Sequence, residues 1–235
     1  MTLAALASTA WVAAAVKTTT MASLPEPRSD HSCDLYKNYV YITGGCKSDQ
    51  VYYDEFGGSA CAVYSKRLDR YDLDANTWTK MADMPKERYR HTSAVANGKL
   101  FVFGGIIGGG AEVASIDVDV YDFTTNMWRT VYGLFPDATV DLDSAVVRDS
   151  QDKEVIVLVG GYTLPDYISV SSTHLFDPVS ETFNFNVSTL VRTDFLPGDG
   201  WAATRTADAT STGYPFHSPA LLEPRPRRPV RLCCR

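Results

Sequence analysis

The feature that most constrains the fold of this chain is a repeated set of spacings. Three glycine doublets each follow a short apolar run. After each doublet comes an aromatic residue followed by Asp, and a second aromatic residue stands 7 positions after the first. The first aromatic residues of successive units are 50 and 55 residues apart, so the chain is predicted to repeat one structural unit. The markers are Gly44-Gly45, Tyr71 and Trp78; Gly104-Gly105, Tyr121 and Trp128; and Gly160-Gly161, Phe176 and Phe183.

The second unit is the most regular and predicts antiparallel strands. Its first strand is expected at 91–95, and Asn97-Gly98 then supplies a two-residue hairpin turn because both residue types tolerate positive φ. The next strand, at 99–103, is almost entirely apolar, which predicts that it is covered on both faces.

The rest of this unit predicts two further strands. Residues 116–120 alternate apolar residues with Asp, as a strand with two different faces does. A turn at 123–126 returns the chain to a fourth strand at Trp128. No long segment of helical periodicity intervenes, so the predicted fold class is all-β.

A run of four apolar residues, a double Gly and then spaced Tyr and Trp resemble the Kelch repeat, whose period is about 50 residues. The resemblance covers about residues 21–185 and implies that each unit is one four-stranded blade of a Kelch-type β-propeller. The third unit departs from the pattern. Phe183 replaces Trp there, and Thr139 and Leu142 stand where the other units have Arg and His.

The number of blades is lower than a closed propeller needs. Propellers typically close with 4–8 blades, and three units are visible, so the predicted propeller is partial. Truncation is the preferred explanation, and a fragment or half of an assembly remain open; self-association or missing blades would close the ring. Within a propeller at 21–205, blades are expected near 21–83, 84–134 and 135–187, with a partial fourth at 188–205.

The two ends differ from the repeats. Residues 1–20 form an apolar N-terminal segment, which is interpreted either as a signal peptide or as a stray strand. Residues 206–235 are rich in Pro and Arg and are predicted to be a disordered tail. A cytoplasmic location is favoured over secretion.

Charge and cysteine content exclude several classes of protein. The net charge is −6, and five Arg and one Glu lie in 221–235, so the remainder carries −10. An acidic body argues against nucleic-acid binding, and no apolar run is long enough to span a membrane. The five Cys form no CxxC pair, which gives a zinc site no support. Cys46 and Cys61 bracket one loop and are either a disulfide or two free thiols.

No motif predicts catalysis, a metal or a cofactor. The glycine-rich stretch 104–110 lacks the Gly-Lys-Ser/Thr of a phosphate loop. Asp72-Leu73-Asp74 lacks the later glycine of a calcium loop and is interpreted as a turn. His31 and His91 occupy equivalent repeat positions and are expected to satisfy backbone groups within the blades. The chain is therefore predicted not to be an enzyme and to hold no cofactor.

Two sets of residues are candidates for binding a partner. Arg28 and Arg88 precede the first strand of their units, on the face where Kelch proteins commonly bind partners, and Arg suits carboxylates. The alternative is that each Arg ties adjacent blades through a carboxylate. The second set lies in the longest loop, between Gly45 and Tyr71, where aromatic residues stand beside acids and either contact a partner or fold on their own hairpin. These residues are Tyr52, Tyr53, Asp54, Glu55 and Phe56.

The predicted function is a non-enzymatic protein-binding module, a scaffold or adaptor whose loops contact another protein. The alternatives are a carbohydrate-active enzyme of the galactose oxidase or sialate mutarotase kind, and a truncated fragment without function. The sequence does not identify the partner.

Overall fold

The computed structural model describes residues 20–47, 52–53, 59–108, 113–149 and 151–184. All regular elements in this part of the chain are β-strands, and none of it forms a helix able to span a membrane. The predicted N-terminal segment up to residue 19, the partial fourth blade at 188–205 and the tail at 206–235 lie outside the described residues.

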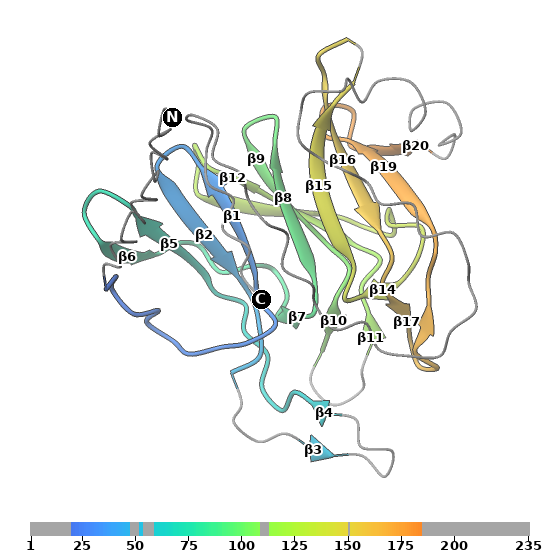
Figure 1. The fold of residues 1–235 in the computed structure, drawn as a ribbon, viewed down its shortest axis with the longest axis horizontal. Helices are drawn as coiled ribbons and strands as arrows, with labels where there is room; N and C mark the ends of the chain where they lie inside the picture. The colour runs from blue at the N-terminus through green and yellow to red at the C-terminus, as the bar shows by residue number, and fades with distance from the viewer. Residues whose placement is uncertain (1–19, 48–51, 54–58, 109–112, 150, 185–235) are drawn as a thin grey trace, which may run out of the picture.

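Three four-stranded antiparallel sheets stand next to one another (Figure 1). We name the four strands of each sheet a, b, c and d in chain order. Strands that follow one another in the chain are neighbours in each sheet, which confirms the predicted blades of a partial Kelch-type propeller. Strands a of adjacent blades contact one another, so they form the inner edge of the arrangement. The first blade comprises β1 (Ser32–Tyr36), β2 (Tyr39–Thr43), β5 (Leu68–Asp72) and β6 (Thr77–Lys80); the second β8 (Thr92–Ala96), β9 (Lys99–Phe103), β12 (Val118–Asp122) and β13 (Met127–Val131); the third β15 (Asp143–Arg148), β16 (Glu154–Val159), β19 (Thr173–Asp177) and β20 (Thr182–Asn184).

Strand b is the centre of the second blade, as its apolar run predicts. Leu100, Phe101, Val102 and Phe103 are all fully buried. The turn before this strand has φ of 47° at Asn97 and 68° at Gly98, as predicted. Both faces of strand b are covered because a blade of a propeller is packed between two others.

Strand c of the second blade starts later than its alternating pattern predicts. It begins at Val118, and Ile116 is 45% exposed in the preceding loop. Asp117 accounts for the difference, because its carboxylate accepts a hydrogen bond from the Gly133 N–H at 2.9 Å and pairs with Lys86 at 2.7 Å. These contacts hold the segment in a loop conformation.

The repeated aromatic pair has a direct structural role. Tyr121 donates its hydroxyl hydrogen bond to Asn126 at 2.7 Å, and Trp128 donates its indole N–H to the carbonyl of Ala82 in the preceding linker at 2.8 Å. In the third blade Phe176 and Phe183 keep the ring contact, with centroids 5.0 Å apart, but have no group to make these hydrogen bonds. The spacing of 7 therefore reflects ring packing across the c–d turn.

Candidate functional site

The b–c hairpins and the d–a linkers gather at one end of the blades, the lower end in Figure 1. We call this end the hairpin face and define it by its short strands. They are β3 (Tyr52–Tyr53) and β4 (Ser59–Ala60) in the first blade; β7 (Arg88–Tyr89), β10 (Ile106–Ile107) and β11 (Val113–Ala114) in the second; and β14 (Thr139–Val140), β17 (Tyr162–Thr163) and β18 (Ile168–Ser169) in the third. Ile106 and Ile107 belong to β10, so part of the glycine-rich stretch 104–110 is a paired strand.

A small apolar core lies beneath the hairpin face and connects all three blades. It includes Tyr64 from the first blade, Tyr89 and Ile106 from the second, and Val140 from the third. The rings of Tyr64 and Tyr89 lie 4.7 Å apart. Because each blade contributes side chains, these residues at the bases of the hairpins pack against one another across the blades.

The question left open for Cys46 and Cys61 is resolved by the structure, in which a disulfide joins them across a separation of 15 residues. Cys46 is buried in the small apolar core, and its backbone pairs with both Ser29 and Tyr64. The bond thus closes the long b–c loop of the first blade at its base.

Replacing Cys61 by Ser is expected to destabilise the protein by about 3 kcal/mol, because the unfolded chain loses the constraint on a loop of this length. Denaturant unfolding measures the loss. Val63→Ser, an exposed change in the same loop, is the control and is expected to fall within about 0.5 kcal/mol of the unchanged protein. Equal unfolding midpoints for Cys61→Ser and the control would contradict the prediction.

Three residues in the left-handed backbone region mark the linkers on the hairpin face. Asp30, Arg90 and Asp141 have φ of 51°, 55° and 55°. Their backbones are joined in series, because the N–H of Arg90 donates to the carbonyl of Asp30 at 3.0 Å and the N–H of Asp141 donates to that of Arg90 at 2.9 Å. Backbone strain of this kind is found at binding sites more often than elsewhere.

The side chains of these three residues form a charged row. Arg90 pairs with Asp141, with Nε and Oδ2 3.5 Å apart. Burial alone lowers the pKa of Arg90, but the nearby Asp141 and Asp30 outweigh that effect and raise it overall. Asp30 and Asp141 are exposed, so the row presents two carboxylates and one guanidinium near the surface.

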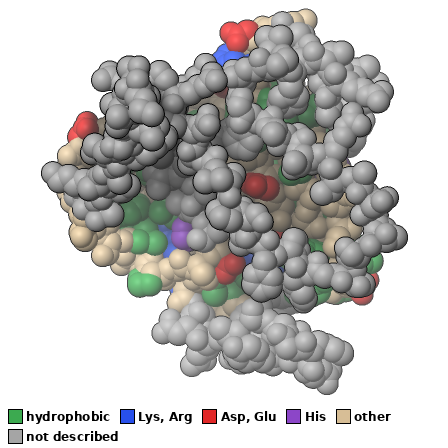
Figure 2. Space-filling model, in the orientation of Figure 1, with side chains coloured by type: hydrophobic (Ala, Val, Ile, Leu, Met, Phe, Trp, Pro, Cys, Tyr) green, Lys and Arg blue, Asp and Glu red, His purple; other side chains and the backbone are tan. Residues whose placement is uncertain are grey.

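Apolar side chains are exposed on the same face. Val113 is 53% exposed on β11, and Tyr162, Tyr167 and Ile168 on or beside β17 and β18 are 40%, 47% and 61% exposed. On the side of the molecule drawn in Figure 2, which has the orientation of Figure 1, the coloured charged side chains lie among hydrophobic and neutral ones. Exposed aromatic and aliphatic residues beside a few charges are typical of a protein-binding surface.

Arg28 and Arg88 lie away from the exposed surface. Both guanidinium groups are fully enclosed, and they pair with Asp69 and Asp119 on strand c. Arg88 also donates to the carbonyl of Gly104 at 2.9 Å, while its own backbone carbonyl accepts from Gly45 of the first blade at 2.8 Å. This placement favours a structural role for both residues, because a partner has no access to an enclosed guanidinium. The carboxylate that each Arg binds belongs to its own unit and not, as the alternative expected, to the adjacent blade.

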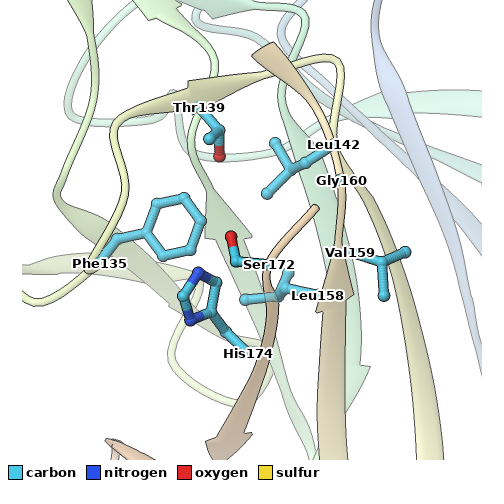
Figure 3. Close-up of a pocket in the computed structure, with 8 residues that line it drawn as sticks. All are labelled: Phe135, Thr139, Leu142, Leu158, Val159, Gly160, Ser172 and His174. Atoms are coloured by element: carbon cyan, nitrogen blue, oxygen red, sulfur yellow. The ribbon is translucent and has the colours of Figure 1, made fainter. Parts of the chain in front are cut away.

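The third blade replaces both members of this ion pair. Thr139 takes the place of Arg88 in the linker, and His174 takes the place of Asp119 on strand c. His174 instead bonds the carboxylate of Asp137 at 2.8 Å, and Ser172 donates to the same oxygen at 2.8 Å. A pocket lies between Thr139 and His174, and among the described residues no Arg side chain occupies it (Figure 3).

The two equivalent histidines have structural partners. His31 Nδ1 lies 3.1 Å from the carbonyl of Arg28, as predicted for a backbone-satisfying role. His91 differs, because its Nε2 lies 2.9 Å from the hydroxyl of Thr43 in the preceding blade. Burial lowers the pKa of His91 well below its usual value, so its ring is neutral at pH 7.

The acidic turns are structural as well. Asp72 accepts hydrogen bonds from the N–H groups of Asp74 and Ala75, both at 2.9 Å, and Asp122 and Asp177 do the same in the other blades. These hydrogen bonds support the turn interpretation of the Asp residues. Within the described residues no group of His, Cys, Asp or Glu is arranged to hold a metal ion.

The predicted contact segment of the long loop is only partly described. Tyr52 and Tyr53 form β3, which pairs with β4 as a hairpin, and Asp54, Glu55 and Phe56 lie outside the described residues. Their contact with a partner stays a prediction.

The charged row and the exposed apolar residues of the third-blade hairpin were missed by sequence reasoning. The one sequence signal for the charged row was a charged residue at the same place in each unit. Asp30 and Arg90 directly precede the repeated His, and Asp141 directly precedes the Leu that replaces it.

Comparison with known proteins agrees with this geometry. The family model of the Kelch motif matches residues 27–85 and 87–131. Alpha-scruin of Limulus polyphemus is 34% identical over 105 residues, which are 45% of this chain and 11% of alpha-scruin. Kelch domain-containing protein 10 of Homo sapiens is 29% identical over 153 residues, which cover 56% of this chain and 34% of that protein.

A solved structure shares the architecture. The structure of YjhT superposes with a TM-score of 0.54 at 19% identity, covering 71% of this chain and 53% of that chain. At this identity the likeness shows the fold alone. The chain spans about a tenth of alpha-scruin and about a third of Kelch domain-containing protein 10.

Proposed function

We propose that this chain, which belongs to the Kelch-repeat family, is a non-enzymatic binding module, a scaffold or adaptor that presents its b–c hairpins and d–a linkers to another protein. The hairpin face carries the proposal. It carries exposed apolar residues from two blades together with a charged row, and a small apolar core shared by the three blades lies beneath it.

The composition of the hairpin face supports a protein as the partner. Tyr and Ile side chains supply contact area at low cost in conformational entropy, and the charged row supplies orientation. The acidic net charge of −6 argues against a nucleic acid. Kelch proteins as a family bind other proteins, which is consistent with this use of the loops.

Replacing Ile168 and Val113 together by Asp is expected to weaken partner binding at least tenfold without unfolding the protein. Both side chains are more than half exposed, so they contribute little to stability, but a buried unpaired carboxylate in an interface is unfavourable. Quantitative affinity capture with the unchanged chain identifies the partner, and titration of the purified partner measures the loss.

The matched control is Val179→Asp. Val179 is 69% exposed in the c–d turn of the third blade, at the end away from the hairpins. It is expected to leave binding unchanged.

Replacement of 52–56 by a Gly-Ser segment tests the long loop in the same assay. Binding that survives both the Ile168→Asp, Val113→Asp variant and the loop replacement would exclude the hairpin face. Turnover of a sugar by the purified chain would contradict the non-enzymatic role.

A further inference from the structure

The first two blades hold an arginine side chain at the same position, between the linker that enters the blade and strand c. Arg28 pairs with Asp69 at 2.7 Å. Arg88 pairs with Asp119 and also donates to the carbonyl of Gly104 at the end of strand b, at 2.9 Å. Both guanidinium groups are fully enclosed. A blade of this chain therefore has a place of the right shape for a guanidinium.

The third blade keeps the walls of this place and replaces its two charged residues. Thr139 and His174 stand at the two positions, and Figure 3 shows the pocket that lies between them. Gly160, which corresponds to Gly104, also lines the pocket. The buried apolar side chains of the wall are Phe135, Leu142 and Leu158.

A carboxylate stands at the rim of this pocket. Asp137 precedes Thr139 by two residues. Its Oδ2 accepts hydrogen bonds from Ser172 and His174, both at 2.8 Å, and within the described residues its Oδ1 accepts none. The side chain of Asp137 is 39% exposed. One carboxylate oxygen is therefore available to a donor that enters from solvent.

The charge at the rim differs from that of the second blade. There Lys86 and Asp117 form an ion pair at 2.7 Å, and the third blade has Asp137 and the neutral Ser172 at the same two positions. Burial alone raises the pKa of Asp137, but the hydrogen bonds from Ser172 and His174 outweigh that effect and lower it overall. The carboxylate is thus charged at pH 7, and the rim suits a cation.

We propose that this pocket binds an arginine side chain of the partner protein, whose guanidinium donates to Asp137 while its stem packs on Phe135 and Leu142. Arg is favoured over Lys because its planar fork can reach a carboxylate and a carbonyl together, as Arg88 does. Thr139 belongs to β14, so the pocket adjoins the hairpin face. That the arginine comes from a protein rests on the function proposed above; the affinity of the pocket for arginine does not.

The test is an NMR titration of the full chain with N-acetyl-arginine N-methylamide, a blocked arginine. Saturable shifts of the His174 ring and the Thr139 amide signals are expected, and the citrulline analogue, which has no charge, is expected to cause none. Asp137→Asn is expected to raise the dissociation constant about tenfold, because a hydrogen bond between two charged groups is lost. The control is Asp152→Asn, in the same blade with its side chain 84% exposed, which is expected to leave it unchanged.

A second variant gives the pocket an arginine of its own. Thr139→Arg combined with His174→Asp places in the third blade the pair that Arg88 and Asp119 form in the second. It is expected to fold with a melting temperature at or above that of the unchanged chain and to bind no blocked arginine. This variant decides the question if Asp137→Asn folds poorly, and a double variant that still binds blocked arginine overturns the proposal.

The remaining outcomes separate the pocket from the proposed function. Absence of saturable shifts, equal shifts with the citrulline analogue, or equal affinity for Asp137→Asn would overturn the pocket, even if the Ile168→Asp, Val113→Asp variant loses the partner. If blocked arginine binds as expected but that variant keeps the partner, the pocket stands and the proposed function fails. If Asp137→Asn loses blocked arginine and keeps full affinity for the partner, the partner does not supply the arginine.

Discussion

Replacing Arg88 by Met is expected to destabilise the protein by about 3–5 kcal/mol, which is the usual effect of removing one partner from a buried ion pair. Asp119 is fully buried and would lose the guanidinium that neutralises it. Desolvation lowers the pKa of Arg88, and the carboxylates of Asp119 and Asp117 oppose this effect, so the charged pair depends on both of its members. Denaturant unfolding followed by tryptophan fluorescence measures the change.

Two further variants test whether the loss of stability in Arg88→Met comes from breaking the buried ion pair. Arg129→Met removes an ion pair with Glu181 in which Arg129 is half exposed, and exposed pairs contribute about 0–1 kcal/mol. Arg88→Met combined with Asp119→Leu removes both buried charges and is expected to regain much of the stability. If Arg88→Met costs no more than Arg129→Met, Arg88 does not have the structural role that its burial indicates.

Replacing Gly104 by Ala is expected to be the second most damaging change. The residue has φ of +62°, and a Cβ there would lie 2.5 Å from the carbonyl oxygen of Thr139 and 2.8 Å from a methyl of Leu142. The left-handed conformation alone costs about 1–2 kcal/mol for a residue with a side chain. Overlap with the neighbouring blade is expected to add roughly 1–3 kcal/mol.

Gly133→Ala separates these two effects. Gly133 has φ of +61°, and a Cβ there would meet nothing within 4 Å. Its loss of stability is expected to reflect conformation alone, so the difference between the two variants measures the closeness of the blades. Thermal unfolding of both proteins gives that difference, and equal losses would show that the linker can move away from Gly104.

The fold was predictable to the level of blades because each blade is local in sequence. Strands a to d of the second blade occupy a continuous segment, and the Asn97-Gly98 turn and the apolar strand b are signals that a reader of the sequence can use. The start of strand c was predicted two residues early. Asp117 is held in a loop by Gly133 and by Lys86, which are 16 and 31 residues away.

The candidate site was less predictable, because it depends on contacts between units. For Arg28 and Arg88 the sequence left open either binding of a partner or a structural tie through a carboxylate. The structure pairs them with Asp69 and Asp119 inside the propeller. The Cys46–Cys61 disulfide was one of two open choices until the structure brought the two thiols together. Exposure of Ile168 follows from the pairing of β14, β17 and β18, which spans 30 residues of sequence.

The sequence by itself determined the repeat, the strand order within a blade and the positions of the glycine doublets. These follow from local spacing, turn chemistry and the alternation of side chains along a strand. The tertiary structure alone decided which side of each blade meets its neighbour, which charges are buried and which hairpin residues remain exposed. The reason is that burial is set by packing between segments about 50 residues apart, and Gly104 shows this most directly. The sequence shows only that Gly104 belongs to a repeated doublet, and the structure shows that the carbonyl of Thr139 occupies the space that a side chain there would need.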